Sequence, residues 1–253
     1  MAEPLVELRH VTFGYEREPI LRDVSLAIHP RDYLAIIGPN GGGKTTLLKI
    51  ILGLLRPWSG EVIVRVPRGR MGYVPQFSTF DRHFPLKVEE VVLMGRWSHR
   101  GLFRPYTRED RAAVRRVLER LHLTSVARLP IGALSGGQMQ RTLIARAVVS
   151  EPAILFLDEP LASVDAESRE VVSRLLSELN QRIPVVIVTH DITAIAPFVK
   201  QIACVNRRLF YHGAGEITRE MLEEVYGCPV ELIAHGIPHR VLPSHEERCG
   251  PPH

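Results

Sequence analysis

The feature that most constrains this chain is the stretch GPNGGGKTT, which runs from Gly38 to Thr46. It follows the apolar run 33–37 and precedes the apolar run 47–52, so a buried strand leads through a cluster of glycines into a helix. Because ordering glycine costs conformational entropy, such a cluster indicates a backbone that wraps closely around something. The pattern G-x-x-x-x-G-K-T indicates that this something is a phosphate group.

Backbone N–H groups of such a loop converge on an anion, and the positive N-terminal end of the next helix adds to the attraction. Lys44 is expected to reach the β- and γ-phosphates of a nucleotide, and the hydroxyl of Thr45 to bind Mg²⁺. A glycine turn without a ligand is the competing interpretation, which the order of strand, loop, Lys-Thr and helix disfavours. The residues predicted to bind phosphate are Gly38, Pro39, Asn40, Gly41, Gly42, Gly43, Lys44, Thr45 and Thr46.

An acidic motif, ILFLDEP, ends a predicted strand at residues 154–160. A buried strand that ends in Asp158 places a carboxylate at the carboxyl edge of the sheet, where open α/β folds bind ligands and where it can support Mg²⁺. Glu159, one residue on, is expected to polarise an attacking water. Taken alone, the same residues are compatible with an ordinary helix N-terminus whose acids face the helix dipole.

The motif LSGGQ, residues 134–138, precedes an amphipathic helix predicted from Met139 to Val149. Ser135 is a good N-terminal cap, and Gly136 and Gly137 free the backbone, so this is a second helix start suited to an anion. One nucleotide hardly needs two such sites from one molecule. A capped helix with a glycine turn is the plain alternative.

With these motifs together, the chain resembles the nucleotide-binding subunits of ATP-binding cassette (ABC) transporters, to at least about residue 215. GPNGGGKT is similar to the family's Walker A motif and ILFLDE to its Walker B motif with the catalytic glutamate, while LSGGQ is identical to its signature. Two departures are small: Thr45 stands where serine is frequent, and Ala162-Ser163-Val164 replaces the commoner Ser-Ala-Leu. Neither removes a functional group that the chemistry needs.

The resemblance implies further site residues. Tyr15 in FGY corresponds to the ring that stacks on adenine, Gln76 in YVPQ to the Q-loop glutamine, and His190 in VTHD to the switch histidine. Gln76 is expected to meet the metal or the attacking water, and His190 to donate to the γ-phosphate. Asp165 in LASVD corresponds to the D-loop, which contacts a second subunit. Without the family, an exposed turn tyrosine and a helix cap are the alternatives for Tyr15 and Asp165.

The resemblance also explains the second helix start, because two copies in this family pack head to tail. Ser135, Gly136 and Gly137 of one copy close on the γ-phosphate that the other copy holds, which gives two composite sites in a symmetric pair. The implied cofactors are ATP and Mg²⁺. The implied catalytic residues are Lys44, Gln76, Glu159 and His190, the metal ligands are Thr45, Gln76 and Asp158, and the remaining nucleotide contacts are Tyr15, Ser135, Gly136, Gly137, Gln138 and Asp165.

The chain has 253 residues, of which 45% are hydrophobic, enough for the core of one large α/β unit. β-Branched residues over 5–37 predict antiparallel strands, and helical periodicity between about 86 and 150 interrupts a framework of buried strands. The elements predicted after the glycine loop are a helix from Lys44 to Leu55 stopped by Pro57, strands at 61–66, 71–74, 153–157 and 184–189, and a helix from Ala166 to Asn180.

The expected fold is therefore a RecA-like P-loop NTPase core with an antiparallel β subdomain and an α-helical subdomain, which is the ABC ATPase type. One ABC ATPase domain is expected over the whole chain. Its predicted parts are the core with the β subdomain at 1–85 and 151–215, the helical subdomain with the signature at 86–150, and a C-terminal extension at 216–253.

The number and distribution of charged residues limit the kinds of partner that this chain can bind. The net charge of +4 is too small to argue for nucleic acid, but eight arginines against three acids lie between Arg96 and Arg120. Membrane phosphates would attract such a cluster at roughly 1 kcal/mol per basic residue, and a solvated helical face explains it equally well. Aromatic residues between the arginines are few, so no nucleic-acid partner is expected.

Three cysteines without a C-x-x-C pair argue against a disulfide framework and favour a reduced cytoplasm. The longest apolar runs fall far short of the roughly 20 residues that cross a bilayer, so no membrane span is expected. By resemblance, the protein is expected to lie peripherally at the cytoplasmic face of the cell membrane, against integral permease subunits.

The stretches DRHFPLKVEEVVLMGRW, GLFRPYTRED, PIGALSGGQ and YGCPVELIAHG resemble most the ATPase subunits of manganese, zinc and iron importers, which an extracellular metal-binding protein serves. Siderophore and cobalamin importers share part of this region and stay as an alternative. A soluble ABC ATPase of DNA repair or ribosomes usually has a coiled-coil insertion or two cassettes, and this chain has neither. A P-loop kinase does not explain LSGGQ.

The end of the chain is rich in side chains that zinc accepts. Their spacing matches no closed zinc site, and a polar tail is the favoured interpretation. The residues are His235, His239, His245, Cys249 and His253.

Overall fold

The computed structural model describes residues 3–76, 85–99, 105–161, 165–190 and 199–212. None of the helices among these residues combines the length and the apolar character that a bilayer span requires. Some predicted features lie outside the described residues. They are Ala162-Ser163-Val164, the arginines Arg100 and Arg104, and the C-terminal extension with His235, His239, His245, Cys249 and His253.

The N-terminal part forms a three-stranded antiparallel sheet in the order β2-β1-β4. Alternate residues of β1, such as Val6 and Leu8, are buried, as the period of two requires for a sheet with one covered face. The antiparallel strands predicted within 5–37 are confirmed. The strands are β1 (Val6–Tyr15), β2 (Glu18–Ile28) and β4 (Ser59–Val64).

A second sheet has six strands in the order β5-β6-β7-β3-β8-β9. All neighbouring pairs are parallel except β8 with β9. Every residue of β3, β6 and β7 is buried, as expected for parallel strands with both faces covered. The strands are β3 (Tyr33–Ile37), β5 (Met71–Val74), β6 (Ile154–Asp158), β7 (Val185–Val188), β8 (Gln201–Asn206) and β9 (Arg208–His212).

The carboxyl ends of β3, β6 and β7 meet at one edge of this sheet. β7 is the middle strand, and Val188 at its end pairs with Ile36 of β3 and with Asp158 of β6. The glycine loop follows β3, Glu159 follows β6 and His190 lies just beyond β7. Residues far apart in the chain therefore come together at this edge.

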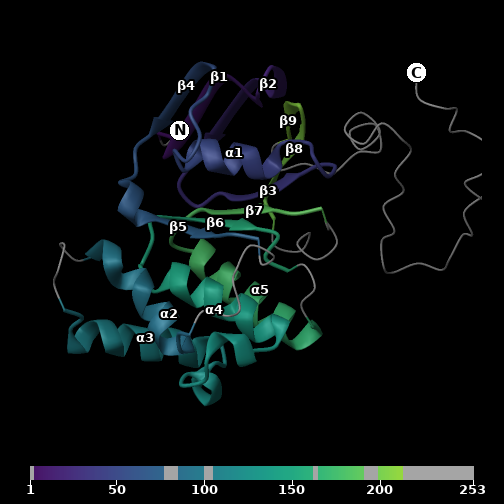
Figure 1. Ribbon diagram of the computed structural model, residues 1–253. Coiled ribbons are helices and arrows are strands. Elements are labelled where there is room, and N and C mark those ends of the chain that lie inside the picture. Colours follow the sequence, from purple (N-terminus) through teal and green to yellow (C-terminus); the bar gives the residue numbers. More distant parts are fainter. Residues whose placement is uncertain (1–2, 77–84, 100–104, 162–164, 191–198, 213–253) are drawn as a thin grey trace, which may run out of the picture. The chain divides into compact units, whose positions relative to one another are not determined.

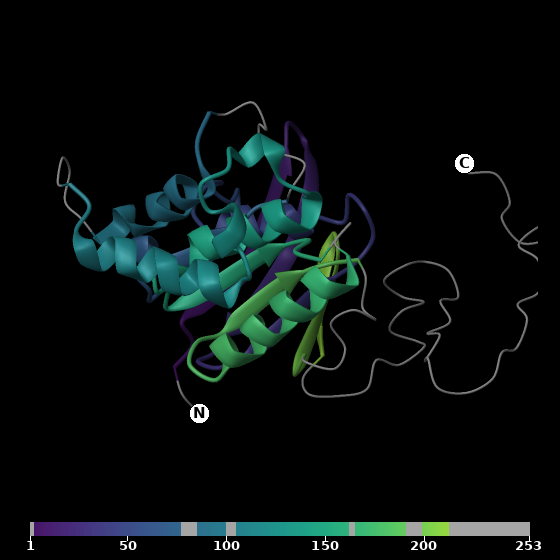
Figure 2. The ribbon, with the colours of Figure 1, turned by 90° about the horizontal axis from the view of Figure 1, so that it is seen from below.

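The helices cover both sheets. α1 lies between the two sheets, α4 and α5 cover the opposite face of the parallel sheet, and α2 and α3 pack with α4 (Figure 1). Seen from below, α2, α3, α4 and α5 lie in front of the parallel sheet (Figure 2). The described α-helices are α1 (Lys44–Ile51), α2 (Val88–Met94), α3 (Arg108–Arg120), α4 (Gly136–Val148) and α5 (Ala166–Asn180), and short 3₁₀ helices occupy Arg68–Arg70, Gly95–His99, Thr124–Val126 and Ile131–Ala133.

The predicted end of the first helix was wrong. α1 ends at Ile51 instead of Leu55, because Gly53 adopts a left-handed conformation with φ 71°. Gly53 N–H donates to the carbonyl of Ile50 (2.9 Å) and Leu54 N–H to that of Lys49 (2.8 Å), which is the hydrogen-bond pattern of a Schellman motif. The glycine therefore stops the helix before Pro57 can.

Other boundaries shift by a few residues. The strand predicted at 61–66 is Ser59–Val64, and the helix predicted from Met139 begins at Gly136. The helix predicted from Ala166 to Asn180 has those bounds. The predicted architecture of a parallel core sheet, an antiparallel β subdomain and packed helices is confirmed.

Candidate functional site

Lys44 begins α1 directly after the glycine loop, with Gly43 at the N-cap position (φ 98°). Its Nζ donates hydrogen bonds to the carbonyl oxygens of Gly38 (2.8 Å) and Pro39 (3.0 Å). Burial lowers the pKa of this ammonium group, while the acids at the end of β6 act in the opposite direction. The loop thus carries a partly desolvated cation, which a bound anion would stabilise.

Two of the loop glycines are required by packing within the fold. A Cβ atom on Gly38 would lie 2.0 Å from the carbonyl oxygen of Val205 in β8, and one on Gly42 would lie 2.7 Å from it. The N–H of Arg207 also donates to the carbonyl of Gly42 at 3.2 Å. The end of β8 therefore fixes the path of the loop from behind.

Thr45 and Asp158 join the glycine loop to the acidic motif. Thr45 Oγ1 donates a hydrogen bond to Asp158 Oδ2 at 2.8 Å. Asp158 is 1% exposed, and its other oxygen, Oδ1, has no hydrogen-bond partner among the described residues. Burial raises the pKa of this carboxyl group, and the bond from Thr45 opposes the rise.

An unpaired carboxylate oxygen beside a hydroxyl suits a hard divalent cation, because Mg²⁺ prefers oxygen ligands. Asp158 and Thr45 therefore fit the predicted Mg²⁺ site. A cation at this position would satisfy the buried oxygen Oδ1, which in the described part of the chain has no other partner.

Glu159 stands immediately after β6 in a left-handed conformation with φ 51°. Its N–H donates to the carbonyl of Val188 at 2.8 Å, which fixes the backbone at the sheet edge. The carboxylate is buried, and Oε1 lies 2.8 Å from Nδ1 of the exposed His190. Two of the predicted catalytic residues are thus in direct contact.

These groups line a cleft of about 290 Å³ at the sheet edge. Gln76 reaches it from the end of β5. Ile20 of β2 also lines it, and the sequence gives no sign of this beyond an apolar residue in a strand. The lining residues are Ile20, Asn40, Gly41, Gly42, Gly43, Lys44, Thr45, Thr46, Gln76, Asp158 and Glu159.

Tyr15 does not line this cleft. It ends β1 with its side chain half exposed, and its ring contacts Phe13 edge to face at 5.3 Å between ring centroids. Phe13 also contacts Trp58, at 6.2 Å. The ring of Tyr15 is therefore supported from one side and open to a ligand.

The signature residues gather at the start of α4. Ser135 Oγ accepts from the N–H of Gln138 (3.3 Å), and Gln138 Oε1 accepts from the N–H of Ser135 (3.0 Å), which forms a capping box. Neither residue lines the cleft around Lys44.

The start of α5 lies directly against this helix start. A Cβ atom on Gly137 would lie 2.5 Å from Asp165 Oδ2 and 2.5 Å from Ser168 Oγ. Asp165 caps α5 by accepting from the N–H (2.8 Å) and the hydroxyl (3.0 Å) of Ser168, and these bonds lower its pKa. The predicted D-loop residue and the signature thus form one cluster, separate from the lining of the Lys44 cleft.

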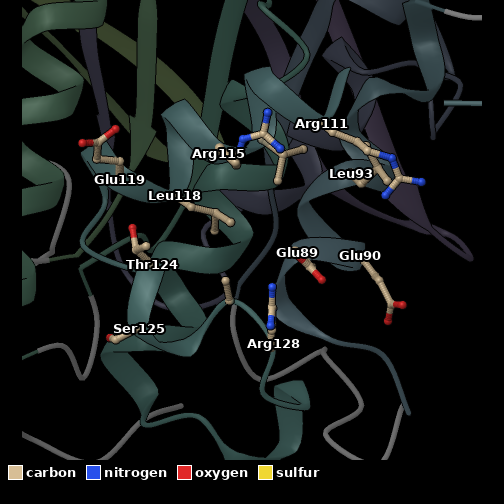
Figure 3. A pocket seen from close by; sticks show the side chains of 12 residues that line it. Glu89, Glu90, Leu93, Arg111, Arg115, Leu118, Glu119, Thr124, Ser125 and Arg128 are labelled. Carbon is tan, nitrogen blue, oxygen red and sulfur yellow. The ribbon is translucent and has the colours of Figure 1, made fainter. Parts of the chain in front are cut away.

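The described arginines of the arginine-rich segment are exposed, with the exception of Arg96; the exposed ones are Arg108, Arg111, Arg115, Arg116 and Arg120. Arg96 is an internal cross-link, because its side chain is 12% exposed and forms ion pairs with Asp110 and Glu151, both at 3.1 Å. A cavity of about 760 Å³ lies between α2, α3 and residues 124–128 (Figure 3). Its rim is mixed in charge, with Arg111, Arg115 and Arg128 beside Glu89, Glu90 and Glu119.

The fold and the cleft define a class of protein, a P-loop nucleotide-binding ATPase with a signature helix. The model of the family described as "ABC transporter" matches residues 21–162. The chain belongs to the ABC transporter family. The predicted family is confirmed, and this protein is an ATPase of that family.

Relatives match most of the chain. The zinc uptake system ATP-binding protein ZurA of Listeria innocua is 36% identical over 220 residues, which cover 83% of this chain and 86% of the relative. The manganese transport system ATP-binding protein MntB of Bacillus subtilis is 37% identical over 230 residues, which cover 88% of this chain and 92% of the relative.

Solved structures match as well. An inward-facing ABC transporter ascribed to the metal-chelate type is 31% identical, with a TM-score of 0.81 and coverage of 90% of both chains. A dimeric ATP-binding cassette in a post-hydrolysis state, bound to ADP and phosphate, is 30% identical, with a TM-score of 0.73 and coverage of 84% of this chain and all of that chain.

Proposed function

We propose that this protein is the subunit that hydrolyses ATP in an importer of Zn²⁺ or Mn²⁺, with Fe²⁺ in the same class, and that a separate membrane permease carries the ion. The observation that carries the proposal is the convergence of Lys44, the pair Thr45 with Asp158, and the pair Glu159 with His190 at one sheet edge. The choice of metal ions rests on similarity to zinc and manganese uptake proteins over more than four fifths of the chain.

Binding of ATP would rearrange the glycine loop. Lys44 would release the carbonyl oxygens of Gly38 and Pro39 and donate to β- and γ-phosphate oxygens instead. The negative charge of the phosphates would then balance the charge of its ammonium group. The N–H groups from Gly41 to Thr46 and the start of α1 would surround the phosphates. The ring of Tyr15 would stack on adenine, with Phe13 behind it.

Hydrolysis forms a bond from water oxygen to the γ-phosphorus and breaks the bond to the oxygen that bridges to the β-phosphate. Glu159 would take a proton from the attacking water, and Gln76 would orient that water. His190 would donate to the γ-phosphate. Thr45, Asp158 and Gln76 would hold Mg²⁺, which neutralises phosphate charge as the leaving oxygen becomes negative.

A second copy of the chain would complete the site. The signature residues do not line the Lys44 cleft of their own chain, so a head-to-tail dimer in which Ser135, Gly136 and Gly137 of each copy face the γ-phosphate of the other accounts for both sites. Gln138 and Asp165 would lie at this contact. The similar ATP-binding cassette that is dimeric with ADP and phosphate bound supports dimer formation here.

The permease would dock on the helical part at the cytoplasmic face of the membrane. Met94 (49% exposed) and Trp97 (57% exposed) stand beside a cavity of about 520 Å³ that Tyr73 and Tyr106 also line, and such exposed apolar groups are typical of protein contacts. An extracellular metal-binding protein would act through that permease and not touch this chain. The same proposal divides the chain into three parts. The nucleotide-binding core comprises residues 1–85 and 151–215, the helical subdomain residues 86–150, and the C-terminal extension residues 216–253.

Labelled Zn²⁺ and Mn²⁺ transport into vesicles that hold the full complex tests this function. Vesicles with the cassettes and ATP inside are expected to accumulate one of these ions, because an importer moves its ion toward the cassette side. Lys44→Ala is expected to abolish both transport and hydrolysis. His10→Ala is the matched control, because the exposed ring of His10 bonds Asp23 and neither residue lines the cleft. Uptake of a ferric siderophore or of cobalamin in place of the ions would favour the alternative importer class. If no permease co-purified with the protein, a soluble ABC ATPase would be favoured.

A further inference from the structure

Thr189 is a polar residue at the sheet edge to which the proposed function assigns no role. It follows β7 directly and is 5% exposed. Its N–H donates to the carbonyl of Ile36 at 3.1 Å, so its backbone is fixed to β3. Its hydroxyl Oγ1 lies 3.3 Å from Oε2 of Glu159, in buried surroundings.

The direction of this hydrogen bond follows from the charge. An ionised carboxylate only accepts hydrogen bonds, so the hydroxyl of Thr189 is the donor to Glu159. The other oxygen of Glu159, Oε1, is 2.8 Å from Nδ1 of His190. Two consecutive residues beyond β7 therefore hold the two oxygens of one carboxylate.

The two contacts of the Glu159 carboxylate, from His190 and from Thr189, differ in how exposed the contacting side chain is. The side chain of His190 is 57% exposed and can turn away into solvent or toward a ligand. The side chain of Thr189 is enclosed and its backbone is part of the sheet edge. A turn of His190 away from Glu159 would therefore leave the bond from Thr189 in place.

Glu159 needs such support because of its backbone. Its φ of 51° is unusual for a residue with a long side chain, and such conformations persist where the surroundings hold them in place. The bond from its N–H to Val188 fixes the main chain, and Thr189 fixes the far end of the side chain.

We propose that Thr189 is a positioning residue for hydrolysis: its hydroxyl holds Oε2 of Glu159, so that the carboxylate keeps its orientation toward the water while His190 moves to the γ-phosphate. This inference rests on the proposed function, in which Glu159 accepts a proton from the attacking water. Thr189 itself touches neither water nor phosphate in this role.

The test compares Thr189→Val, which keeps the shape but lacks the donor, with Thr189→Ser, which keeps the donor. Thr189→Val is expected to lower kcat about 10- to 100-fold, as for a misplaced reacting group, with the KM for ATP and ATP binding unchanged. Thr189→Ser is expected to keep kcat close to wild type. Thr12→Val, which removes a hydroxyl that accepts from the N–H of Asp23 in the antiparallel sheet, is the matched control.

A double-mutant cycle separates this inference from the function on which it rests. In single-turnover hydrolysis, Thr189→Val is expected to add no further loss to Glu159→Gln, because both remove the same oriented carboxylate. Full activity of Glu159→Gln would contradict the proposed function itself. Two results would overturn only the role of Thr189. In the first, Glu159→Gln is inactive while Thr189→Val is fully active. In the second, Thr189→Ser loses as much kcat as Thr189→Val. Retained ATP binding verifies folding, and Thr189→Ala replaces the valine variant should that variant not bind.

Discussion

The hydroxyl of Thr45 lies 2.8 Å from Asp158 Oδ2, although 113 residues separate the two in the chain. They meet because β3 and β6 end at the same edge of the sheet, on either side of β7. The contact satisfies one carboxylate oxygen and leaves Oδ1 buried without a partner in the described structure. The site is thus arranged for a cation at the expense of the stability of the nucleotide-free protein.

Asp158→Asn is expected to stabilise the nucleotide-free protein in EDTA and to abolish hydrolysis. Burial raises the pKa of Asp158 above 3.8, so its ionised form destabilises the fold at neutral pH. An unpaired amide costs less than an unpaired charge, and Tm should rise by about 2 to 4 °C, the effect of about 1 kcal/mol in a domain of this size. Thermal unfolding followed by circular dichroism measures it.

The pH dependence of this effect has a defined sign. Because the folded pKa of Asp158 is the higher one, wild-type stability falls as pH rises from 3.8 through the folded pKa. The advantage of Asp158→Asn should therefore shrink as the pH is lowered toward 4. Asp165→Asn is the opposite control, because the pKa of Asp165 is lowered and its charge stabilises the fold above that pKa. An advantage of Asp158→Asn that is independent of pH would contradict this reading of the buried charge.

Gly137→Ala is expected to destabilise the protein by about 1 to 3 kcal/mol, as overpacking does. Its Cβ would lie 2.5 Å from both Asp165 Oδ2 and Ser168 Oγ, so these two side chains must shift and lose the hydrogen bonds that cap α5. Hydrolysis should fall while ATP still binds to the Lys44 cleft, which does not include Gly137. Urea unfolding and fluorescent-nucleotide binding measure the two effects.

Ser168→Ala is the control for that variant, because it removes the bond to Asp165 without adding bulk to α4. In the double variant, the missing hydroxyl should restore part of the stability lost in Gly137→Ala. No recovery would mean that the close approach of α4 and α5 does not set the requirement for glycine.

Glu159→Gln is expected to form a dimer when ATP and Mg²⁺ saturate it, because hydrolysis no longer removes the γ-phosphate that a second copy recognises. Light scattering should give twice the monomer mass with ATP and the monomer mass with ADP. Adding Ser135→Glu should prevent the dimer, because a carboxylate would face the triphosphate. A Glu159→Gln protein that stays monomeric with ATP would contradict the composite site.

Arg207→Gly is expected to stabilise the protein by about 1 kcal/mol, because Arg207 has a left-handed φ of 58° that glycine adopts without steric cost. The main-chain bonds from Arg207 N–H to Gly42 (3.2 Å) and from Arg22 N–H to the carbonyl of Arg207 (2.6 Å) are kept. Arg208→Gly is the matched control, since Arg208 lies in β9 and glycine there should destabilise. Differential scanning calorimetry of the three proteins distinguishes these outcomes.

Local pattern accounts for what was predicted correctly. Local structure depends on residues that are close in the chain, such as an apolar run next to glycines, a capping residue or an acid at a strand end. For this reason the sequence predicted the glycine loop, the strand that ends at Asp158 and the helix from Ala166 to Asn180. The end of the first helix differs from the prediction, because Gly53 in a left-handed conformation ends the helix four residues before Pro57.

The sequence by itself determined the family, the strand-loop-helix of the glycine loop and the choice of candidate site residues, because these depend on residue type and short spacing. Only the tertiary structure decided that Thr189 holds Glu159, that Val205 sets the path of the glycine loop, and that Gly137 rests on Asp165. Such contacts join segments through strand order and packing distance, and no spacing along the chain encodes either one.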